Sequence, residues 1–507
     1  MWKRAFVACV FLASFVSAGR AENANDVVAS VARTMGANNL KSLQYSATGS
    51  YFTFGQNYGL KDPWPRFALK SYTRSIDYEN AASEEKFDWA QFEDGERGGG
   101  LIPLKGAVSS DIFVSGDSAW GSALFELVTF GVAHAVDERQ MQIAITPAGW
   151  VRAAMAANPT MESKTVHGKK MTVVSFVWKG KYKVNGYVDG QNLLEKVETW
   201  LPQAILGDML IETTYSDYRD YAGVKFPSRI VQKQGAFPVL DLAVTDVQPN
   251  APVNIHVPDA ARNGPATVHV ETQQLADGEW FIRAGFNSMA VEFKDYVVLL
   301  DPITDEARSL AVIAEVNKLA PNKPIKYVFN THHHFDHAGG LRTFVAQGAT
   351  IITAEMNKPY YGKIFKLPHT LVPDELAQNP KPATYIRVKD KYVLTDGSQS
   401  IEFYAIPGNS HSPDMLIAYL PKGKIVFEGD MYNPGLAPPR PDSPPPAAVQ
   451  LIGDKEFLRD ALKRRNLDVQ QFAPVHGSGP VPFANLQKEI DIEHELLQKM
   501  EAAGATK

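Results

Sequence analysis

Cysteine is almost absent from this sequence: Cys9 is the only one in 507 residues. It lies in the N-terminal segment that we interpret below as a secretory signal, so the mature chain would carry no thiol. This excludes disulfide bonds, cysteine-ligated zinc and a Cys–His nucleophile from the mature protein. Any metal site must therefore use other side chains.

An excess of positive charge is also missing, since 51 Lys and Arg are balanced by 56 Asp and Glu, for a formal net charge of -5. Proteins that grip a phosphate backbone use clustered Lys and Arg, so nucleic acid is a disfavoured partner. Apolar residues make up 45% of the chain, which is enough to bury a core. The length exceeds that of one typical domain, and we expect two.

Long hydrophobic runs are missing as well. The charged pair Lys3 and Arg4 precedes an apolar stretch, Ala5–Phe15, which is shorter than the roughly 20 residues of a membrane-spanning helix. The small residues Val16–Ala18 follow, as is typical of a cleavable signal peptide. We therefore expect residues 1–21 to be a signal peptide, no stable membrane span, and a periplasmic or secreted protein. An uncleaved membrane anchor is the alternative.

Beyond the signal, the pattern changes part-way along the chain. A short amphipathic helix is predicted over Asp26–Met35, and from Leu43 to Val247 short runs rich in Tyr, Phe, Val and Thr are broken by Gly, Pro and Asp. This spacing predicts a mostly antiparallel β-rich domain over residues 22–250. Residues 251–265 contain prolines and little periodicity, which indicates a linker.

Residues 266–507 have an α/β pattern instead. Strands are expected over Glu279–Phe286, Ala290–Phe293 and Tyr296–Leu300. A helix over Glu306–Leu319 and a buried strand over Ile325–Phe329 follow. Strand, helix and strand in this order indicate a layered α/β domain.

Four candidate metal ligands lie within six residues after the last of these strands: His332, His334, Asp336 and His337. In an extended backbone alternate side chains point the same way, so His332 and His334 would converge while His333 faces elsewhere. Asp336 and His337 would then open a helix that runs through Leu341–Ala346. One short turn would thus present ligands in two directions, which suits two metal ions.

The segment Thr331–Gly340 resembles the HxHxDH signature of the metallo-β-lactamase superfamily. The resemblance covers roughly Ala266 to the C-terminus and implies an αββα sandwich. It implies that Asp301, at the end of a strand, orients the histidine loop. His411, Asp430 and His476 match the later ligand positions in the order of the family.

Carried over residue by residue, the resemblance implies two metal ions held by seven side chains. The first ion would be bound by His332, His334 and His411. The second would be bound by Asp336, His337 and His476. Asp430 would touch both ions.

The chemistry of this ligand set suits zinc. Imidazole and carboxylate ligands without thiolate also suit iron, manganese or cobalt, but a histidine-rich site with open positions is typical of catalytic zinc. Two ions about 3.5–4 Å apart share a water whose pKa falls towards about 7. We expect the resulting hydroxide to cleave a small-molecule ester, lactone or amide, a β-lactam included, with Asp336 as the catalytic residue that holds or accepts the proton.

Other functions remain open at this point. Phosphodiesters and sulfate esters are further substrates that the same chemistry allows. A mononuclear iron dioxygenase of the same fold would keep the histidines. A carrier of a lipophilic ligand, with an inactive hydrolase scaffold, is the non-enzymatic alternative, and the substrate itself could be lipophilic.

Several residues around the predicted ligands are assigned supporting roles. Asp301 and Asp414 are candidate partners for the ligating imidazoles. Candidate substrate-facing groups are Tyr360, Tyr361, Tyr432 and Asn433. The remaining histidines are interpreted as surface or packing residues, although the loop of His369 could reach the site: His134, His167, His256, His269, His369 and His494. The proline-rich stretch Pro434–Pro446 is interpreted as a stiff loop beside the site or as a plain surface connection.

The N-terminal part resembles the lipoprotein-carrier fold, in which a curved antiparallel sheet half-wraps a helix. The residues that carry this resemblance are Tyr45–Gly49, Tyr218–Ser228 and Val244–Val247. It implies a concave apolar face that could hold a lipophilic molecule. A packing or dimerisation module is the alternative.

Overall fold

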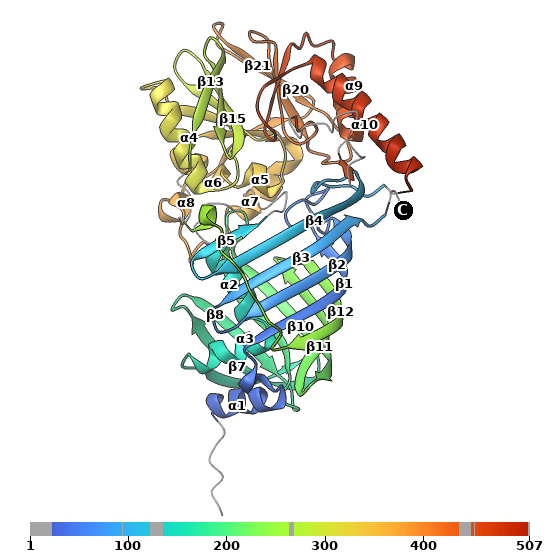
Figure 1. Cartoon of the computed structure of the whole chain (residues 1–507). Coiled ribbons are helices and arrows are strands. Elements are labelled where there is room, and N and C mark those ends of the chain that lie inside the picture. The colour runs from blue at the N-terminus through green and yellow to red at the C-terminus, as the bar shows by residue number, and fades with distance from the viewer. Residues whose placement is uncertain are drawn as a thin grey trace, which may run out of the picture.

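The computed structural model describes residues 23–93, 95–121, 135–262, 268–434, 448–450 and 452–504. The predicted signal peptide, His134 and most of the proline-rich stretch lie outside these ranges. Figure 1 shows a large sheet in the N-terminal half and a layered α/β half stacked upon it. Within the described ranges, no helix combines the length and the apolar character that crossing a membrane requires.

The N-terminal half is built on a 13-stranded sheet, in which every neighbouring pair is antiparallel. The strand order is β24-β4-β3-β2-β1-β12-β11-β10-β9-β8-β7-β6, with β5 paired to β4. The expected mostly antiparallel domain is thus confirmed. The bounds are β1 Ser42–Phe52, β2 Arg66–Asp77, β3 Ala82–Gln91, β4 Leu104–Ser115, β5 Ser118–Gly121, β6 Thr160–Val166, β7 Lys169–Trp178, β8 Tyr182–Val188, β9 Leu194–Gln203, β10 Gly207–Tyr221, β11 Val224–Gln234, β12 Phe237–Pro249 and β24 Ala448–Gln450.

Three helices share an apolar core with this sheet: α1 (Ala24–Thr34), α2 (Ala135–Ala144) and α3 (Pro147–Met155). The helix predicted over Asp26–Met35 corresponds to α1. It begins at Asn23, whose side chain accepts a hydrogen bond from the Asp26 backbone, and this cap satisfies an N–H that the first turn leaves unpaired. Large side chains such as Trp89 and Trp150 are fully buried in this core.

The C-terminal half contains two further sheets, ordered β13-β14-β15-β16-β17-β18-β19 and β20-β21-β22-β23-β25-β26. The first has the bounds β13 Glu271–Ala276, β14 Glu279–Ala284, β15 Phe286–Glu292, β16 Val297–Leu300, β17 Ile325–Phe329, β18 Thr350–Ala354 and β19 Thr384–Val388. The second has the bounds β20 Lys391–Thr395, β21 Ser400–Ala405, β22 Leu416–Leu420, β23 Ile425–Glu428, β25 Gln471–Pro474 and β26 Val481–Pro482.

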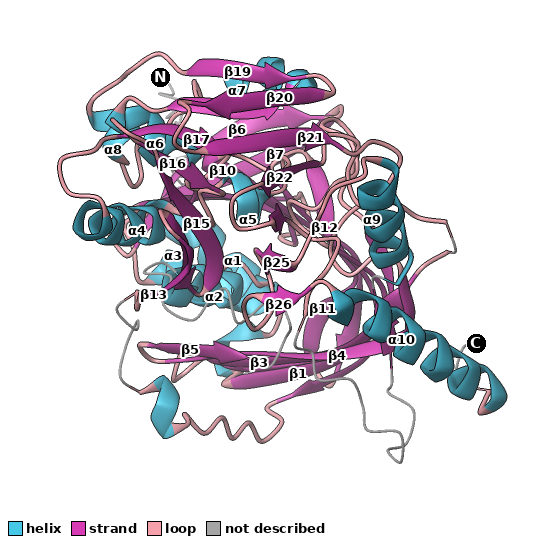
Figure 2. Cartoon of the chain, turned by 90° about the horizontal axis from the view of Figure 1, so that it is seen from above, coloured by secondary structure: helices cyan, strands magenta, loops and turns pink. Residues whose placement is uncertain are grey.

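The two sheets share one core cluster, in which the rings of Phe329 on β17 and Phe403 on β21 lie 4.7 Å apart. Helices α4 (Glu306–Leu319) and α6 (Leu341–Gln347) contact the first sheet. Helices α9 (Ile452–Arg464) and α10 (Ala484–Ala502) share a separate apolar cluster with the second. Figure 2 shows α4 and α9 on opposite sides of this half.

Two predicted elements differ from the structure. The strand expected over Glu279–Phe286 is interrupted at Gly285, where β14 turns into β15. The helix expected from Asp336 through Ala346 is two short helices, α5 (Phe335–Ala338) and α6, separated by Gly339 and Gly340. The Gly340 N–H donates to the Pro302 carbonyl at 2.8 Å, which takes it out of a continuous helix.

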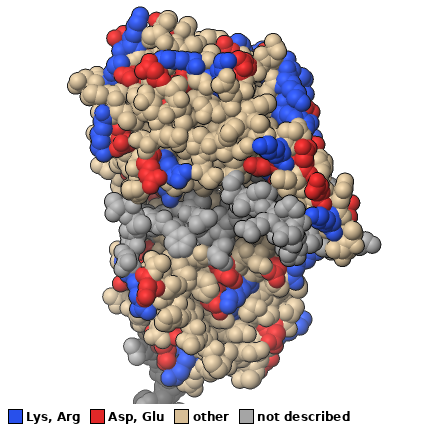
Figure 3. Space-filling view, turned by 45° about the horizontal axis from the view of Figure 1, so that its top comes forward, with Lys and Arg blue, Asp and Glu red and all other residues tan. Residues whose placement is uncertain are grey.

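Charge is distributed evenly over the surface that can be seen. On the face in Figure 3, Lys and Arg are interspersed with Asp and Glu among large neutral areas. That face carries no broad field of one sign, of the kind that a phosphate backbone requires.

Candidate metal centre

All seven predicted ligands lie together at one edge of the C-terminal half, where strands of both sheets end. The loop His332–His337 follows β17, Asp430 follows β23 and His476 follows β25. His411 lies in the loop between β21 and β22. The ends of these strands are buried, and together they bring residues from four segments to one place.

The first group of side chains consists of His332, His334, His411 and Asp430. The Nε2 atoms of His332 and His411 lie 3.2 Å apart, and His411 Nε2 lies 3.1 Å from Asp430 Oδ2. The three imidazoles are buried, with at most 2% of each exposed. The alternation of the chain therefore turns His332 and His334 to the same side, as the sequence predicts.

The second group consists of Asp336, His337, His476 and Asp430. The Nε2 atoms of His337 and His476 lie 3.1 Å apart. Asp430 Oδ1 lies 2.6 Å from the first and 2.9 Å from the second. Asp430 therefore directs one oxygen to each group, which is the arrangement expected of a bridging carboxylate.

These distances fit a pair of cations. Ligand atoms on a tetrahedral zinc at about 2.0–2.1 Å lie roughly 3.4 Å apart, close to the spacing of the paired nitrogens. The His334 Nδ1 atom is buried and has no hydrogen-bond partner in the described part of the chain. Buried polar atoms are almost always satisfied, so an ion is the natural partner for this lone pair.

The electrostatics of the two groups differ. Burial, followed by repulsion from neighbouring histidines, lowers the pKa of His332 and His334 well below the usual value, which keeps both neutral. In the second group burial opposes ionisation of His476, but the Asp430 and Asp336 carboxylates together outweigh it and raise the pKa of His476 to about 9. The facing histidines hold the pKa of Asp430 well below its usual range against the effect of burial. The second group thus attracts positive charge.

Asp301 organises the histidine loop, as expected from its place at the end of a strand. One carboxylate oxygen accepts from the Thr331 N–H at 2.8 Å, and the other accepts from the Thr331 hydroxyl at 2.7 Å and from His337 Nδ1 at 2.8 Å. A carboxylate can only accept here, so His337 carries its proton on Nδ1 and turns Nε2 to the second group. Asp301 has a left-handed φ of 53°, a strained conformation for a non-glycine residue.

Asp414 does not orient a predicted ligand. Its Oδ1 atom lies 2.8 Å from Nδ1 of His333, and its Oδ2 accepts from Asn357 at 2.6 Å. His333 is fully buried and faces away from both groups, as its position between two converging histidines requires. The prediction that Asp414 supports a ligating imidazole is therefore wrong, because its partner His333 is not one of the predicted ligands.

A family comparison matches the same region. The model of the Metallo-beta-lactamase superfamily matches residues 286–469, which include six of the seven side chains and end before His476. Residues 286–469 belong to the metallo-beta-lactamase superfamily. We refer below to the C-terminal half as the metallo-β-lactamase domain.

Individual proteins are similar over part of the chain. A probable hydroxyacylglutathione hydrolase of Schizosaccharomyces pombe is 29% identical over 132 residues, which are 25% of this chain and 42% of that protein. The chain thus spans less than half the length of this relative. A metallo-beta-lactamase from Pontibacter korlensis has 19% identity and a TM-score of 0.34, over 45% of this chain and 99% of that one. A metallo-beta-lactamase from Hirschia baltica has 20% identity and a TM-score of 0.33, over 44% of this chain and 97% of that one.

The candidate substrate-facing residues have different positions around the metallo-β-lactamase site. Tyr361 and Tyr432 are fully buried, so the prediction that they face substrate is wrong. The Tyr361 hydroxyl donates to Asn330, and that of Tyr432 donates to Glu489 on α10. Both tyrosines are packing residues. Tyr360 is partly exposed, and its ring lies 6.2 Å from that of His333.

Asn433 and the proline-rich stretch follow the bridging Asp430. Asn433 is partly exposed, and its buried Oδ1 atom has no hydrogen-bond partner among the residues that the structure describes. The Asn433 amide therefore remains a candidate substrate contact. The stretch itself lies outside the described residues beyond Pro434, so its role stays a prediction.

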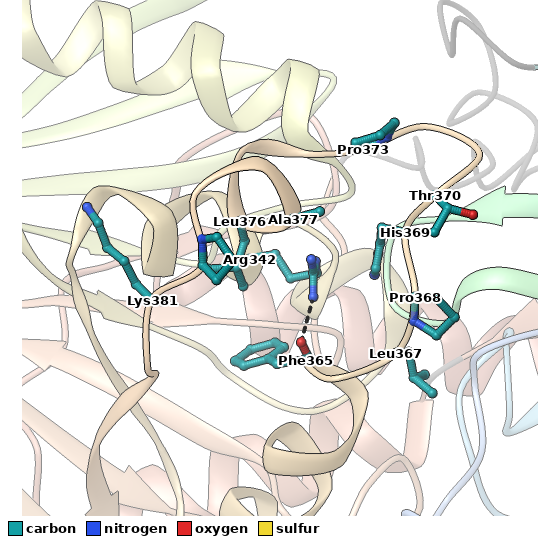
Figure 4. Close-up of a pocket in the computed structure, with 11 residues that line it drawn as sticks. Arg342, Phe365, Leu367, Pro368, His369, Thr370, Pro373, Leu376, Ala377 and Lys381 are labelled. Atoms are coloured by element: carbon teal, nitrogen blue, oxygen red, sulfur yellow. Dashed lines mark hydrogen bonds between the residues drawn. The ribbon is translucent and has the colours of Figure 1, made fainter.

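His369 belongs to a different cavity, which Figure 4 shows. This cavity of about 460 Å³ is lined by Arg342, His369 and Lys381 among others, and by none of the seven predicted ligands. His369 lies 3.7 Å from Asp374, which also binds Arg342. The loop of His369 therefore does not join the metallo-β-lactamase site. Four other histidines are exposed, as expected of surface residues: His167, His256, His269 and His494.

Two loops of the N-terminal half also reach the predicted ligands, and neither was predicted from the sequence. Gln56 and Asn57 contact Asp336 and His334 respectively. The run Gly98–Gly100 lies beside them. Three consecutive glycines between two strands are a sequence signal for a close backbone approach, but they do not reveal what is approached.

Proposed function

We propose that the chain is a metal-dependent hydrolase that binds two zinc ions and cleaves an ester, lactone or amide bond in a small molecule. The single observation that supports this best is the pair of histidine and carboxylate groups that share Asp430. We further propose that the metallo-β-lactamase domain is an αββα sandwich, in line with the helices that share apolar clusters with its two sheets and lie on opposite sides of this half (Figure 2).

A pair of zinc ions, when bound, supplies hydroxide at neutral pH and a Lewis acid for the substrate oxygen. The residues determine where the substrate enters. The side chains of Asp336, His476 and Asp430 are 18, 16 and 11% exposed, whereas the three histidines of the first group are at most 2% exposed. Asp336 Oδ2 lies 3.4 Å from both His337 Nε2 and His476 Nε2 on this open side. It is placed to hold or accept the proton of the attacking water.

The substrate class is the least defined part of the proposal. A hydroxyacylglutathione belongs in any screen because the fission-yeast relative carries that name. A β-lactam belongs there as one amide among others. The N-terminal sheet, which we propose to be related to lipoprotein carriers, adds lipophilic esters to the screen.

We place the hydrolase in the periplasm or outside the cell. The support is the charged, apolar and small-residue order of the first 21 residues. N-terminal sequencing of the protein recovered from a periplasmic fraction tests this placement. An intact N-terminus in the cytoplasmic fraction would contradict it.

The test of the function combines metal quantification with an activity screen over lactones, aryl esters, β-lactams, phosphodiesters and sulfate esters. We expect about two zinc ions per chain and turnover of at least one carbonyl substrate. His334→Ala should abolish turnover and remove the first ion, since it deletes a buried imidazole of that group. His494→Ala, which changes an exposed histidine on α10, is the matched control and should change neither.

Two results would contradict the proposal. Full activity of His334→Ala, or of protein from which all metal has been stripped, would exclude the metal mechanism. Oxygen consumption by an iron-loaded protein without hydrolysis would favour the dioxygenase alternative. Circular dichroism of each variant shows whether the fold is kept.

A further inference from the structure

The turn between β1 and β2 in the N-terminal half reaches the metal centre. Gln56 in this turn is 7% exposed, and its Nε2 atom donates to Asp336 Oδ1 at 2.9 Å. This hydrogen bond fixes one oxygen of the carboxylate. The other oxygen, Oδ2, is left facing His337 and His476 in the second group.

The next residue of the turn fixes a histidine. His334 Nε2 lies 3.0 Å from the Asn57 carbonyl oxygen. A carbonyl oxygen only accepts, so Nε2 carries the hydrogen and Nδ1 is left with a free lone pair. That Nδ1 atom is the buried atom without a partner described above.

A second loop of the N-terminal half packs against both contacts. A Cβ atom built on Gly99 would lie 2.0 Å from Gln56 Oε1, 2.8 Å from His334 Cε1 and 2.9 Å from His334 Nδ1. Only a residue without a side chain fits at this position. The neighbouring Gly98 N–H donates to the carbonyl of Ser410, which precedes the predicted ligand His411, at 2.9 Å.

Aromatic side chains of the two halves pack against each other at this point. Phe335, between the two contacted ligands, lies 5.2 Å from Phe54 and 5.5 Å from Trp64, measured between ring centroids. Its backbone N–H donates to the Gly55 carbonyl at 3.2 Å. The ligand loop is therefore clamped by the N-terminal half on its backbone, its carboxylate and its imidazole.

We propose that the N-terminal half forms one wall of the metal centre, with Gln56 and the Asn57 carbonyl as positioning groups for Asp336 and His334. This inference rests on the proposed function, because only that function makes the two groups of side chains metal-binding sites. It gives the N-terminal half a role in the site itself, in addition to any packing or carrier role. The complete site then requires both halves of the chain.

The first experiment measures zinc alone, without any substrate. Zinc is titrated into the metal-free chain against a competing chelator, for the wild type, for Gln56→Met and for Gln56→Glu. Gln56→Met keeps the length of the side chain but removes the donor to Asp336, so the affinity for the ion of the second group should fall about 10–100-fold, as is usual when a partner of a metal ligand is lost. Gln56→Glu should lower the affinity for that ion further, because it replaces the donor with a second carboxylate that faces Asp336.

The matched control is Gln248→Ala. The Gln248 amide donates to Asp246 at 2.9 Å, which is the same kind of contact on an exposed part of the N-terminal sheet. Its zinc affinities should equal those of the wild type. Cobalt-substituted protein gives a second readout, since the visible absorption bands report ligand geometry and should shift in Gln56→Met but not in Gln248→Ala.

The second experiment tests the wall at Gly99. Gly99→Ala adds one methyl group that crowds Gln56 and His334, so zinc binding to both groups should weaken and the cobalt spectrum should change. Gly190→Ala is the control, because a Cβ atom there meets nothing within 4 Å. Thermal unfolding of both metal-free variants shows whether Gly99→Ala also disrupts the fold, and Gln56→Met then remains the decisive variant.

The outcomes separate this inference from the function on which it rests. Unchanged zinc affinity and cobalt spectra in Gln56→Met, together with loss of zinc in His334→Ala, would show that the N-terminal half does not position the ligands. The proposed metal centre would be unaffected by that result. Unchanged zinc binding in His334→Ala as well would overturn the proposed function. Weakened zinc binding in both variants supports both.

Discussion

At the scale of the residue, three of the five predicted histidine ligands are oriented by a partner that is not itself a predicted ligand: His332, His334 and His337. Asp301 holds Nδ1 of His337, and the Thr331 hydroxyl lies 3.1 Å from Nδ1 of His332. The sequence predicts Asp301 because it ends a buried strand within a known motif. It does not predict the Asn57 carbonyl beside His334, because every residue has such a carbonyl and nothing in its side chain marks it.

Glu279, the first residue of β14, provides a test of how burial affects a carboxyl group, and this test is independent of the metals. Its side chain is fully buried, and burial raises its pKa to about 7 against the smaller opposing effects of Lys422 and the Gly423 backbone. A carboxyl whose pKa is raised by folding stabilises the fold while it is protonated. This contribution is complete below the unfolded pKa of about 4.5 and is lost as the pH rises through about 7.

Glu279→Gln should therefore remove the loss of folding stability that the wild type suffers as the pH rises. At pH 5 the variant and the wild type should unfold at similar urea concentrations, and by pH 8 the variant should be more stable by up to about 3 kcal/mol. Urea unfolding between pH 5 and pH 8 measures the difference. Glu495→Gln, on an exposed part of α10, is the control and should follow the wild type. A constant gap between Glu279→Gln and the wild type would contradict the assignment.

At the scale of the element, periodicity predicts well where one element decides its own bounds. The helix Glu306–Leu319 and the strand Ile325–Phe329 have the predicted bounds. The break between α5 and α6 was not predicted, because Gly339 and Gly340 are excluded from a continuous helix by contacts with another segment. A Cβ atom on Gly340 would lie 2.1 Å from both the Pro302 carbonyl oxygen and the Ser309 hydroxyl.

Two glycine substitutions should therefore have opposite effects on stability. Gly340→Ala inserts a methyl group into backbone that cannot move freely and should lower the free energy of unfolding by about 2–4 kcal/mol. Gly362→Ala lies within α7 (Lys358–Ile364) with open space around its Cβ, and it should raise that free energy by roughly 0.5–1 kcal/mol. Urea unfolding of the metal-free variants measures both, and a neutral Gly340→Ala would show that the loop carrying Pro302 adapts.

At the scale of the whole molecule, the sequence predicts two parts but not how they join. The change in pattern near residue 250 separates a β-rich part from an α/β part, and the structure has both. The joining contacts link residues far apart in the chain, such as Gln56 and Asp336, and short-range patterns cannot reveal them. The strand β24, from the C-terminal half, even pairs with β4 in the N-terminal sheet.

Asp208, at the start of β10, provides a further junction between the halves. Its carboxylate accepts from the backbone N–H groups of Thr370 and Leu371 at 2.9–3.0 Å, and its own N–H donates to the Pro368 carbonyl at 2.7 Å. Together with the turn at Gln56 and the β24–β4 pair, it ties the sheet to the metallo-β-lactamase domain at separate points. Such ties favour unfolding of the two halves as one unit.

Removal of metal tests this unity. A ligand that binds only the folded state stabilises it by mass action, by about 2.7 kcal/mol at a free concentration 100-fold above its dissociation constant. Because the ligand loop is clamped by the N-terminal half, chelation should lower one common thermal midpoint for both halves. Tryptophan fluorescence reports mainly the N-terminal half, which holds six of the seven tryptophans beyond residue 21, and calorimetry reports the whole chain. If the tryptophan transition stayed in place while a second calorimetric transition moved, the halves would unfold independently, and the turn at Gln56 would touch the metal site without sharing its stability.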